Sequence, residues 1–171
     1  MPTKKELRQK LRAVRLSLSL ADRQLHSHQI SANLESAHNW SDVTKLHVFE
    51  PIKSLKEVDI SFFTSFIKAK QPHIKLFTSR QFNTVWQVCN LNKGQPILAP
   101  QFDVVIVPML GFDDSLNRIG YGGGYYDKLL AAQAQTLKIG VCYEAGKISR
   151  VPIENHDIKM DLIVTEKHIY R

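Results

Sequence analysis

Cysteine is scarce in this chain, with two residues among 171, and neither has the neighbours that a structural metal site requires. Cys89 and Cys142 lie far apart, outside any CxxC pair, and each sits in an apolar run typical of a strand. We therefore expect buried free thiols rather than a disulfide or a zinc site. The seven histidines are scattered without an HExxH pair, which argues against an imidazole metal centre and places them on the surface or in loops.

Long apolar runs are also missing. No segment approaches the roughly 18 to 20 apolar residues of a membrane span, and the N-terminal residues MPTKKELRQKLR lack the apolar centre of a signal peptide. These absences predict a cytoplasmic protein without a membrane partner. The length of 171 residues and the balance of 43% hydrophobic and 23% charged residues indicate one folded domain over residues 1–171.

Helical spacing is clearest near the N-terminus, where Thr3 and Glu6 form a capping box. The helix that follows has an apolar stripe and a basic face, and Ser19 opens a second helix toward about Ala37. Asp59 caps a third helix. The predicted apolar positions are Leu7, Leu11, Val14 and Leu18 in the first helix, Leu25, Ile30 and Leu34 in the second, and Ile60, Phe63, Phe66 and Ile67 in the third; the basic face carries Lys4, Arg8, Arg12 and Arg15.

Strands are predicted between and after these helices. The run 102–108 has no polar alternation in its core, as expected of a central parallel strand covered on both faces. The other predicted strands are 46–49, 74–77, 84–91, 138–143 and 162–165. Alternating strands and helices predict an α/β fold, a three-layer α/β/α sandwich with a mostly parallel central sheet. Ligands of such sheets bind beyond the carboxyl ends of the strands, which directs attention to the loop after Val107.

That loop holds four of the eight glycines within five positions, at 120 and 122–124, ahead of an apolar helical run from Lys128 to Ala134. Glycine lets successive backbone N–H groups converge on an anion, so a phosphate site is the sharper hypothesis and a simple turn the plainer one. The loop is neither a Walker A sequence nor GxGxxG. Arg118 before the glycines suits phosphate oxygens, and the tyrosines after them suit stacking on a heterocycle.

Asp127 follows the loop and could hold Mg²⁺ beside a nucleotide or simply complement a helix dipole. The formal net charge of +7 favours an anionic partner without choosing among RNA, nucleotide phosphates and a polycarboxylate ligand. Composition and spacing leave these alternatives open.

The segment Arg118-Ile119-Gly120-Tyr121-Gly122-Gly123-Gly124-Tyr125-Tyr126-Asp127 resembles the signature of the 5-formyltetrahydrofolate cyclo-ligase family, also called methenyltetrahydrofolate synthetase. Further similarity occurs in order along the chain, at residues 4–8, 57–59, 151–157 and 161–166. The resemblance implies an ATP- and Mg²⁺-dependent ligase that converts 5-formyltetrahydrofolate, with or without a polyglutamate tail, into 5,10-methenyltetrahydrofolate, ADP and phosphate.

Carried over by position, the resemblance implies a role for each matching residue. Arg118 and Tyr125 would be catalytic, Asp127 and Asp161 would hold Mg²⁺, and Glu57 would bind folate. The residues expected to contact ATP are Lys4, Arg8, Arg118, Ile119, Gly120, Tyr121, Gly122, Gly123, Gly124, Tyr125 and Tyr126, and those expected to contact folate besides Glu57 are Tyr121, Gly122, Gly123, Gly124 and Tyr125.

Two other functions compete with this interpretation. A sugar-phosphate isomerase could use a similar glycine loop, but it would need no ATP. A basic nucleic-acid-binding module would explain the charge, yet the chain lacks an RNP motif, a KH-type clamp and a helix-turn-helix pattern. We therefore expect no nucleic-acid partner. The sequence leaves the oligomeric state open, with a monomer favoured.

Overall fold

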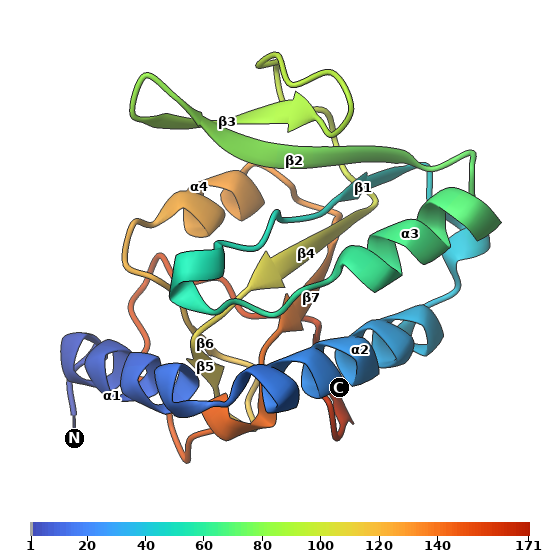
Figure 1. The fold of residues 1–171 in the computed structure, drawn as a ribbon. Coiled ribbons are helices and arrows are strands. Elements are labelled where there is room, and N and C mark those ends of the chain that lie inside the picture. Colours follow the sequence, from blue (N-terminus) through green and yellow to red (C-terminus); the bar gives the residue numbers. More distant parts are fainter. Residues whose placement is uncertain (1) are drawn as a thin grey trace.

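The computed structural model describes residues 2–171 and contains a seven-stranded sheet in the order β3-β2-β1-β4-β7-β8-β9 (Figure 1). The five neighbouring strands from β2 to β8 run parallel, and β3 and β9 pair antiparallel at the two edges. The strands are β1 Lys45–His47, β2 Lys75–Phe82, β3 Val85–Asn90, β4 Val104–Pro108, β7 Leu137–Val141, β8 Leu162–Val164 and β9 Ile169–Tyr170. The helices are α1 Lys4–Ser17, α2 Leu20–Ala37, α3 Ser61–Lys70 and α4 Tyr125–Ala131.

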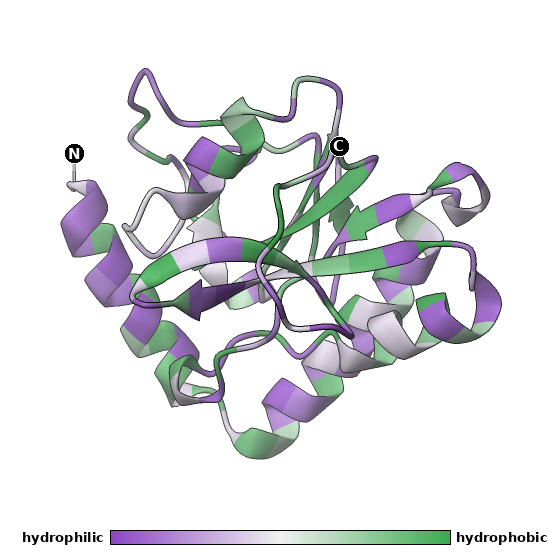
Figure 2. Cartoon of the chain, turned by 90° about the horizontal axis from the view of Figure 1, so that it is seen from above, coloured by the Kyte–Doolittle hydropathy of each residue, from purple (hydrophilic) through white to green (hydrophobic). Residues whose placement is uncertain are grey.

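Helices cover both faces of the sheet, so the predicted three-layer α/β/α sandwich with a mostly parallel sheet is confirmed. One face packs against α2 and α3, where Ile30, Leu34 and Phe63 join the core side chains of the strands. The opposite face packs against α4 through Leu129 and Leu130. Figure 2 shows hydrophobic strands at the centre and mainly hydrophilic residues along α1.

The helix starts follow the local sequence signals. Both halves of the Thr3 and Glu6 capping box are present at α1, and the Ser19 side chain accepts a hydrogen bond from the Asp22 N–H at α2. The Asp59 carboxylate accepts from the Ser61 N–H, 2.9 Å away, at the start of α3. The sequence placed the fourth helix at Lys128, but α4 begins three residues earlier, directly after the glycine loop.

Three side-chain placements differ from the predictions. Leu25, predicted to be buried, is 56% exposed because α2 turns that side to solvent. Arg15, predicted on the basic outer face of α1, is buried. His47, predicted on the surface, is fully buried at the end of β1. A hydrophobic pattern cannot identify a polar side chain that has a buried partner, and both Arg15 and His47 have one.

The sequence did not predict the short elements, because two or three residues are too few to show a hydrophobic periodicity. A two-stranded antiparallel ribbon, β5 Gly111–Phe112 with β6 Arg118–Ile119, follows β4 and carries the chain into the glycine loop. Three 3-10 turns also occur: η1 Trp40–Asp42, η2 Lys53–Leu55 and η3 Glu144–Gly146.

Both cysteines are buried free thiols, as predicted. Among residues 2–171 no helix has the length and apolar character to cross a bilayer.

The burial difference within α2 gives a stability prediction. Leu34→Ala is expected to lower the free energy of unfolding by about 2 to 5 kcal/mol, because it removes a fully buried side chain between the helix and the sheet. Leu25→Ala on the same helix is the matched control and should change it by less than about 0.5 kcal/mol. Chemical denaturation of both variants measures the two values. Equal losses would contradict the orientation of α2.

Candidate active site

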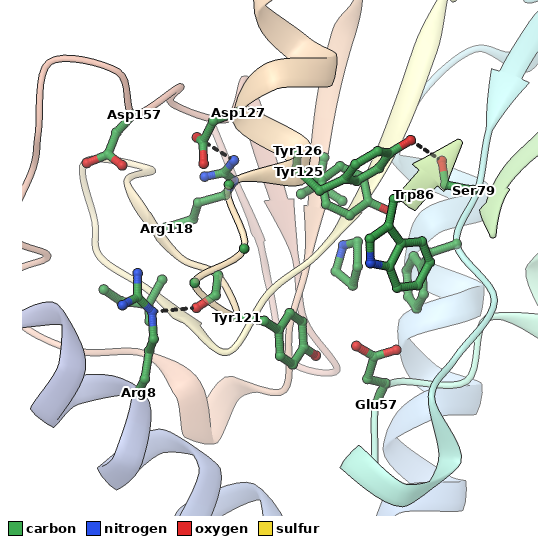
Figure 3. A pocket seen from close by; sticks show the side chains of 18 of the residues that line it. Arg8, Glu57, Ser79, Trp86, Arg118, Tyr121, Tyr125, Tyr126, Asp127 and Asp157 are labelled. Carbon is green, nitrogen blue, oxygen red and sulfur yellow. Dashed lines mark hydrogen bonds and ion pairs between the residues drawn. The ribbon is translucent and has the colours of Figure 1, made fainter. Parts of the chain in front are cut away.

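A pocket of about 380 Å³ lies beyond the carboxyl end of β4, where Val107 and Pro108 form part of its wall. This is the position expected for a ligand of an open parallel sheet. The other lining residues come from α1, the segment after β1, the β2–β3 hairpin, β6, the glycine loop, the start of α4 and the segment before β8 (Figure 3). They are Lys4, Arg8, Phe49, Glu50, Ile52, Leu55, Glu57, Ser79, Trp86, Arg118, Ile119, Gly120, Tyr121, Gly122, Gly123, Gly124, Tyr125, Tyr126, Asp127, Glu154, His156 and Asp157.

Glycine is required at two positions of the loop by its backbone conformation. Gly122 has φ +99° and Gly124 has φ +65°, both in the region that residues with a Cβ rarely adopt. A Cβ at Gly122 would also meet the Arg8 guanidinium carbon at 3.3 Å. The missing side chain at Gly122 therefore lets the α1 arginine lie against the loop, and Gly124 turns the chain into α4.

Three cationic side chains predicted from the sequence do converge on the pocket. Arg8 Nε donates to the Gly120 carbonyl at 3.1 Å, and the Lys4 ammonium contacts Asp157 at 2.5 Å and Glu154 at 3.1 Å. The Arg118 guanidinium, with only 5% of its side chain exposed, donates to Asp127 Oδ1 at 2.7 Å. Arg8 on α1 and Arg118 on β6 are far apart in the sequence but line one cavity (Figure 3).

Carboxylates accompany these cations. Burial lowers the pKa of Arg118, while Asp127 and Asp157 act in the opposite direction and favour its charged form. Burial would raise the pKa of Asp157, but hydrogen bonds from Lys4 and the Glu154 N–H leave it below its ordinary value. The Ile158 N–H, 3.4 Å from Asp127 Oδ1, ties the segment that carries Asp157 to the start of α4. Asp127 and Asp157 therefore line the same end of the pocket.

Asp161, predicted to share a metal ion with Asp127, lies elsewhere. Its carboxylate accepts from the Lys138 N–H at 2.7 Å and pairs with the Lys138 ammonium at 2.8 Å. Lys138 is near the beginning of β7, so this pair sits at the amino ends of the strands, at the edge opposite the pocket. The structure therefore does not bring Asp161 together with Asp127. Asp157, four residues earlier, lines the pocket instead. Both acids precede β8, and the sequence has no signal that tells which of them faces the pocket.

Glu57, predicted to bind a ligand, is buried and lines the pocket. Its Oε2 accepts from the Ile52 N–H at 2.7 Å, which closes the turn that contains η2. Lys56 adopts φ 49° in this turn, so the chain reverses just before Glu57. One carboxylate oxygen is held by the backbone, and the side chain faces the aromatic end of the pocket (Figure 3).

Arg15 was not predicted to contact the glycine loop, because its position in α1 suggested a solvated charge. Its guanidinium donates to the Tyr121 hydroxyl at 2.5 Å and to the Met109 carbonyl. Tyr121 is thereby held between α1 and the pocket, and burial raises the pKa of its hydroxyl. The contact joins the first helix to the centre of the glycine loop across 106 positions of sequence.

The aromatic end of the pocket also contains a series of hydrogen-bonded polar side chains, which the sequence did not predict. Tyr125 lies 5.9 Å from Trp86 between ring centroids, and its hydroxyl is 2.5 Å from Ser79 Oγ. Ser79 Oγ in turn is 2.8 Å from Nε2 of the buried His47. The pocket thus has one end rich in charged groups and another lined by aromatic rings, an arrangement suited to a ligand with phosphates and a heterocycle.

Comparisons with known proteins identify relatives of this chain. The model of the 5-formyltetrahydrofolate cyclo-ligase family matches residues 1–166. A 5-formyltetrahydrofolate cyclo-ligase of Mycoplasma pneumoniae is 26% identical over 96% of this chain and 99% of its own length.

Two solved structures share the fold. A 5,10-methenyltetrahydrofolate synthetase from Mycoplasma pneumoniae superposes with a TM-score of 0.82 at 25% identity, covering 95% of this chain and 98% of its own. The Aquifex aeolicus 5,10-methenyltetrahydrofolate synthetase gives 0.78 at 29% identity, covering 98% and 92%. With nearly its whole length matched by the family model, this chain belongs to the 5-formyltetrahydrofolate cyclo-ligase family.

Proposed function

We propose that this protein uses ATP and Mg²⁺ to convert 5-formyltetrahydrofolate into 5,10-methenyltetrahydrofolate, ADP and phosphate. The observation that carries the proposal is the single pocket in which Lys4, Arg8 and Arg118 face one end while Glu57 and aromatic rings line the other. Membership of the cyclo-ligase family supports the same reaction. A sugar-phosphate isomerase would have no use for the aromatic end.

The two ends of the pocket suggest how the substrates are divided. The ATP phosphates would lie against Lys4, Arg8, Arg118 and the backbone N–H groups of the glycine loop, where positive charge and rigid donors coincide. The folate ring would lie among Tyr121, Tyr125 and Trp86, which offer stacking surfaces. Glu57 would accept hydrogen bonds from the amino and ring N–H donors of the pterin.

The proposed reaction needs no nucleophile from the protein. The formyl oxygen attacks the γ-phosphorus of ATP, the bond from phosphorus to the ADP oxygen breaks, and an N5 iminium phosphate forms. N10 of the folate then attacks the iminium carbon and releases its proton to solvent. Cleavage of the carbon–oxygen bond expels phosphate and leaves the methenyl bridge. Arg118, Lys4 and Arg8 would position the phosphates and offset charge as it moves between oxygens.

The donor set at the charged end is compatible with Mg²⁺. Asp127 and Asp157 supply carboxylate oxygens, which this ion prefers, and it commonly binds through one or two carboxylates together with substrate phosphates. Glu154, His156 and Asp157 also place potential ligand atoms within 4.8 Å of one another. Bound Mg²⁺ would supply neutralising charge for the phosphates. The Arg118 guanidinium pairs with Asp127 and the Lys4 ammonium pairs with Asp157 at this end of the pocket.

The reaction itself is testable by absorbance. Purified protein mixed with 5-formyltetrahydrofolate is expected to produce the near-ultraviolet band of the methenyl product only when ATP and a divalent metal are both present, because the formyl oxygen must be phosphorylated before it can leave. Omitting each component in turn provides the controls. Product formation without nucleotide would refute the mechanism, and no product under any condition would refute the function.

The proposal that Asp157, rather than Asp161, binds Mg²⁺ together with Asp127 gives a paired prediction. Asp157→Asn is expected to raise the Mg²⁺ concentration for half-maximal rate by about tenfold or more, because it removes a charge from the metal-binding end. Asp161→Asn is the matched control and should leave that concentration unchanged, since its partner is Lys138. Metal titrations of the rate, each with a thermal melt, measure this. A shift confined to the Asp161 variant would reverse the assignment.

Glu57→Gln is expected to weaken the binding of 5-formyltetrahydrofolate by about tenfold to a hundredfold, the scale of a hydrogen bond to a charged group. ATP affinity should stay the same, because Glu57 lies at the aromatic end. Glu35→Gln on α2 serves as control, because Glu35 is not among the residues that line the pocket. Isothermal titration with each ligand separates the effects. Equal losses for both ligands would place Glu57 outside the folate site.

A further inference from the structure

Three side chains from separate elements form a continuous hydrogen-bond chain that ends at the pocket. His47 Nε2, at the end of β1, is 2.8 Å from Ser79 Oγ on β2, and Ser79 Oγ is 2.5 Å from the Tyr125 hydroxyl at the start of α4. Ser79 and Tyr125 line the pocket, whereas His47 is fully buried beneath them. A buried imidazole is thus connected to the cavity through two hydroxyl groups.

His47 remains neutral at physiological pH. Complete burial lowers its pKa to about 3, and aromatic rings surround it, with Phe102 and Tyr126 centroids 5.3 and 6.1 Å away. Of its two ring nitrogens, Nε2 contacts Ser79, while Nδ1 is buried with no hydrogen-bond partner within residues 2–171. A neutral imidazole carries one proton, and the ring nitrogen that carries it decides in which direction the hydrogen bonds between His47, Ser79 and Tyr125 run.

The absence of a hydrogen-bond partner for Nδ1 indicates which nitrogen carries the proton. A proton on Nδ1 would leave a buried N–H donor unsatisfied, and orphaned donors are rarer in folded proteins than orphaned acceptors. A proton on Nε2 is instead donated to Ser79 Oγ. The Ser79 hydroxyl, already accepting from the imidazole, then donates its own proton to the Tyr125 oxygen. The Tyr125 proton is left without an acceptor in the described chain and is free for a ligand.

We infer that His47 acts through Ser79 as a positioning residue that makes the Tyr125 hydroxyl a hydrogen-bond donor to an oxygen of the folate substrate. The inference rests on the proposed function for the nature of the ligand. Tyr125 belongs to the aromatic end of the pocket, beside Trp86, where the pterin ring with its carbonyl oxygen would lie. Without a donor at His47, the Tyr125 proton could turn to Ser79 and offer the ligand only a lone pair. Without Ser79, the Tyr125 hydroxyl would lose the partner that fixes its direction.

The tautomer of His47 can be measured without any substrate. A long-range proton–nitrogen correlation spectrum of the ¹⁵N-labelled protein distinguishes a protonated Nε2 from a protonated Nδ1. The expected result is Nε2–H over the whole neutral pH range, with assignment through His47→Gln, which removes the imidazole signals and keeps an N–H donor near the place of Nε2. An Nδ1–H signal for His47 would overturn the inference, because Ser79 would then donate to the ring.

A double-mutant cycle tests the action on the ligand. Ser79→Ala and Tyr125→Phe are each expected to weaken 5-formyltetrahydrofolate binding by about threefold to tenfold, the scale of one hydrogen bond. The double variant should be no weaker than Tyr125→Phe alone, since Ser79 acts through the hydroxyl already removed. Thr78→Val is the matched control, because this neighbouring buried hydroxyl of β2 contacts no polar partner among residues 2–171.

The outcomes separate the inference from the proposed function. Additive effects of Ser79→Ala and Tyr125→Phe, or equal effects on ATP and folate binding, would overturn the inference. If the wild-type protein shows Nε2–H and the non-additive cycle for folate binding but no turnover, the inference stands and the proposed reaction fails. His47→Gln should retain folate affinity within about threefold of wild type, as it preserves a donor. Thermal melts confirm that each variant is folded.

Discussion

The pocket depends on the close packing of α1 against the ribbon and the glycine loop. Leu7 and Leu11 form a small apolar cluster with Leu110, Ile119 and Val151, separate from the two clusters that hold the sheet together. The approach is closest at Gly111, where a Cβ would lie 2.6 Å from the Leu11 side chain and 2.5 Å from the Gly146 carbonyl. A larger residue at Gly111 would push α1 away.

With α1 in place, its arginines make contacts that a free helix would lack. Arg8 holds the Gly120 carbonyl and Arg15 holds the Tyr121 hydroxyl. The absence of a side chain at Gly122 leaves room for Arg8 against the loop, and the loop in turn gives the arginines fixed positions. The charged end of the pocket is therefore preorganised by contacts made before any ligand binds, which lowers the cost of ordering long cationic side chains on binding.

Sequence patterns predicted the regular elements well and the site in part. Periodicity and capping located α1, α2 and the buried strand β4, and the glycine cluster pointed to the loop at its carboxyl end. They failed for Arg15 and His47, whose burial depends on partners about 100 and 30 positions away. Asp157 and Asp161 are both acids before a short strand, and only the chain path distinguishes them. Local patterns carry no information about such distant pairings.

The dependence of the pocket on α1 also constrains the order in which the molecule assembles. Ribosomes make α1 before its hydrogen-bond partners, because Gly120 and Tyr121 follow more than 100 residues later and Asp157 follows Lys4 by 153. The sheet can close around α2 and α3 without α1, because none of the α1 core residues belongs to that cluster. Helix α1 is thus made early but docks late, after the glycine loop and Asp157 have been synthesised.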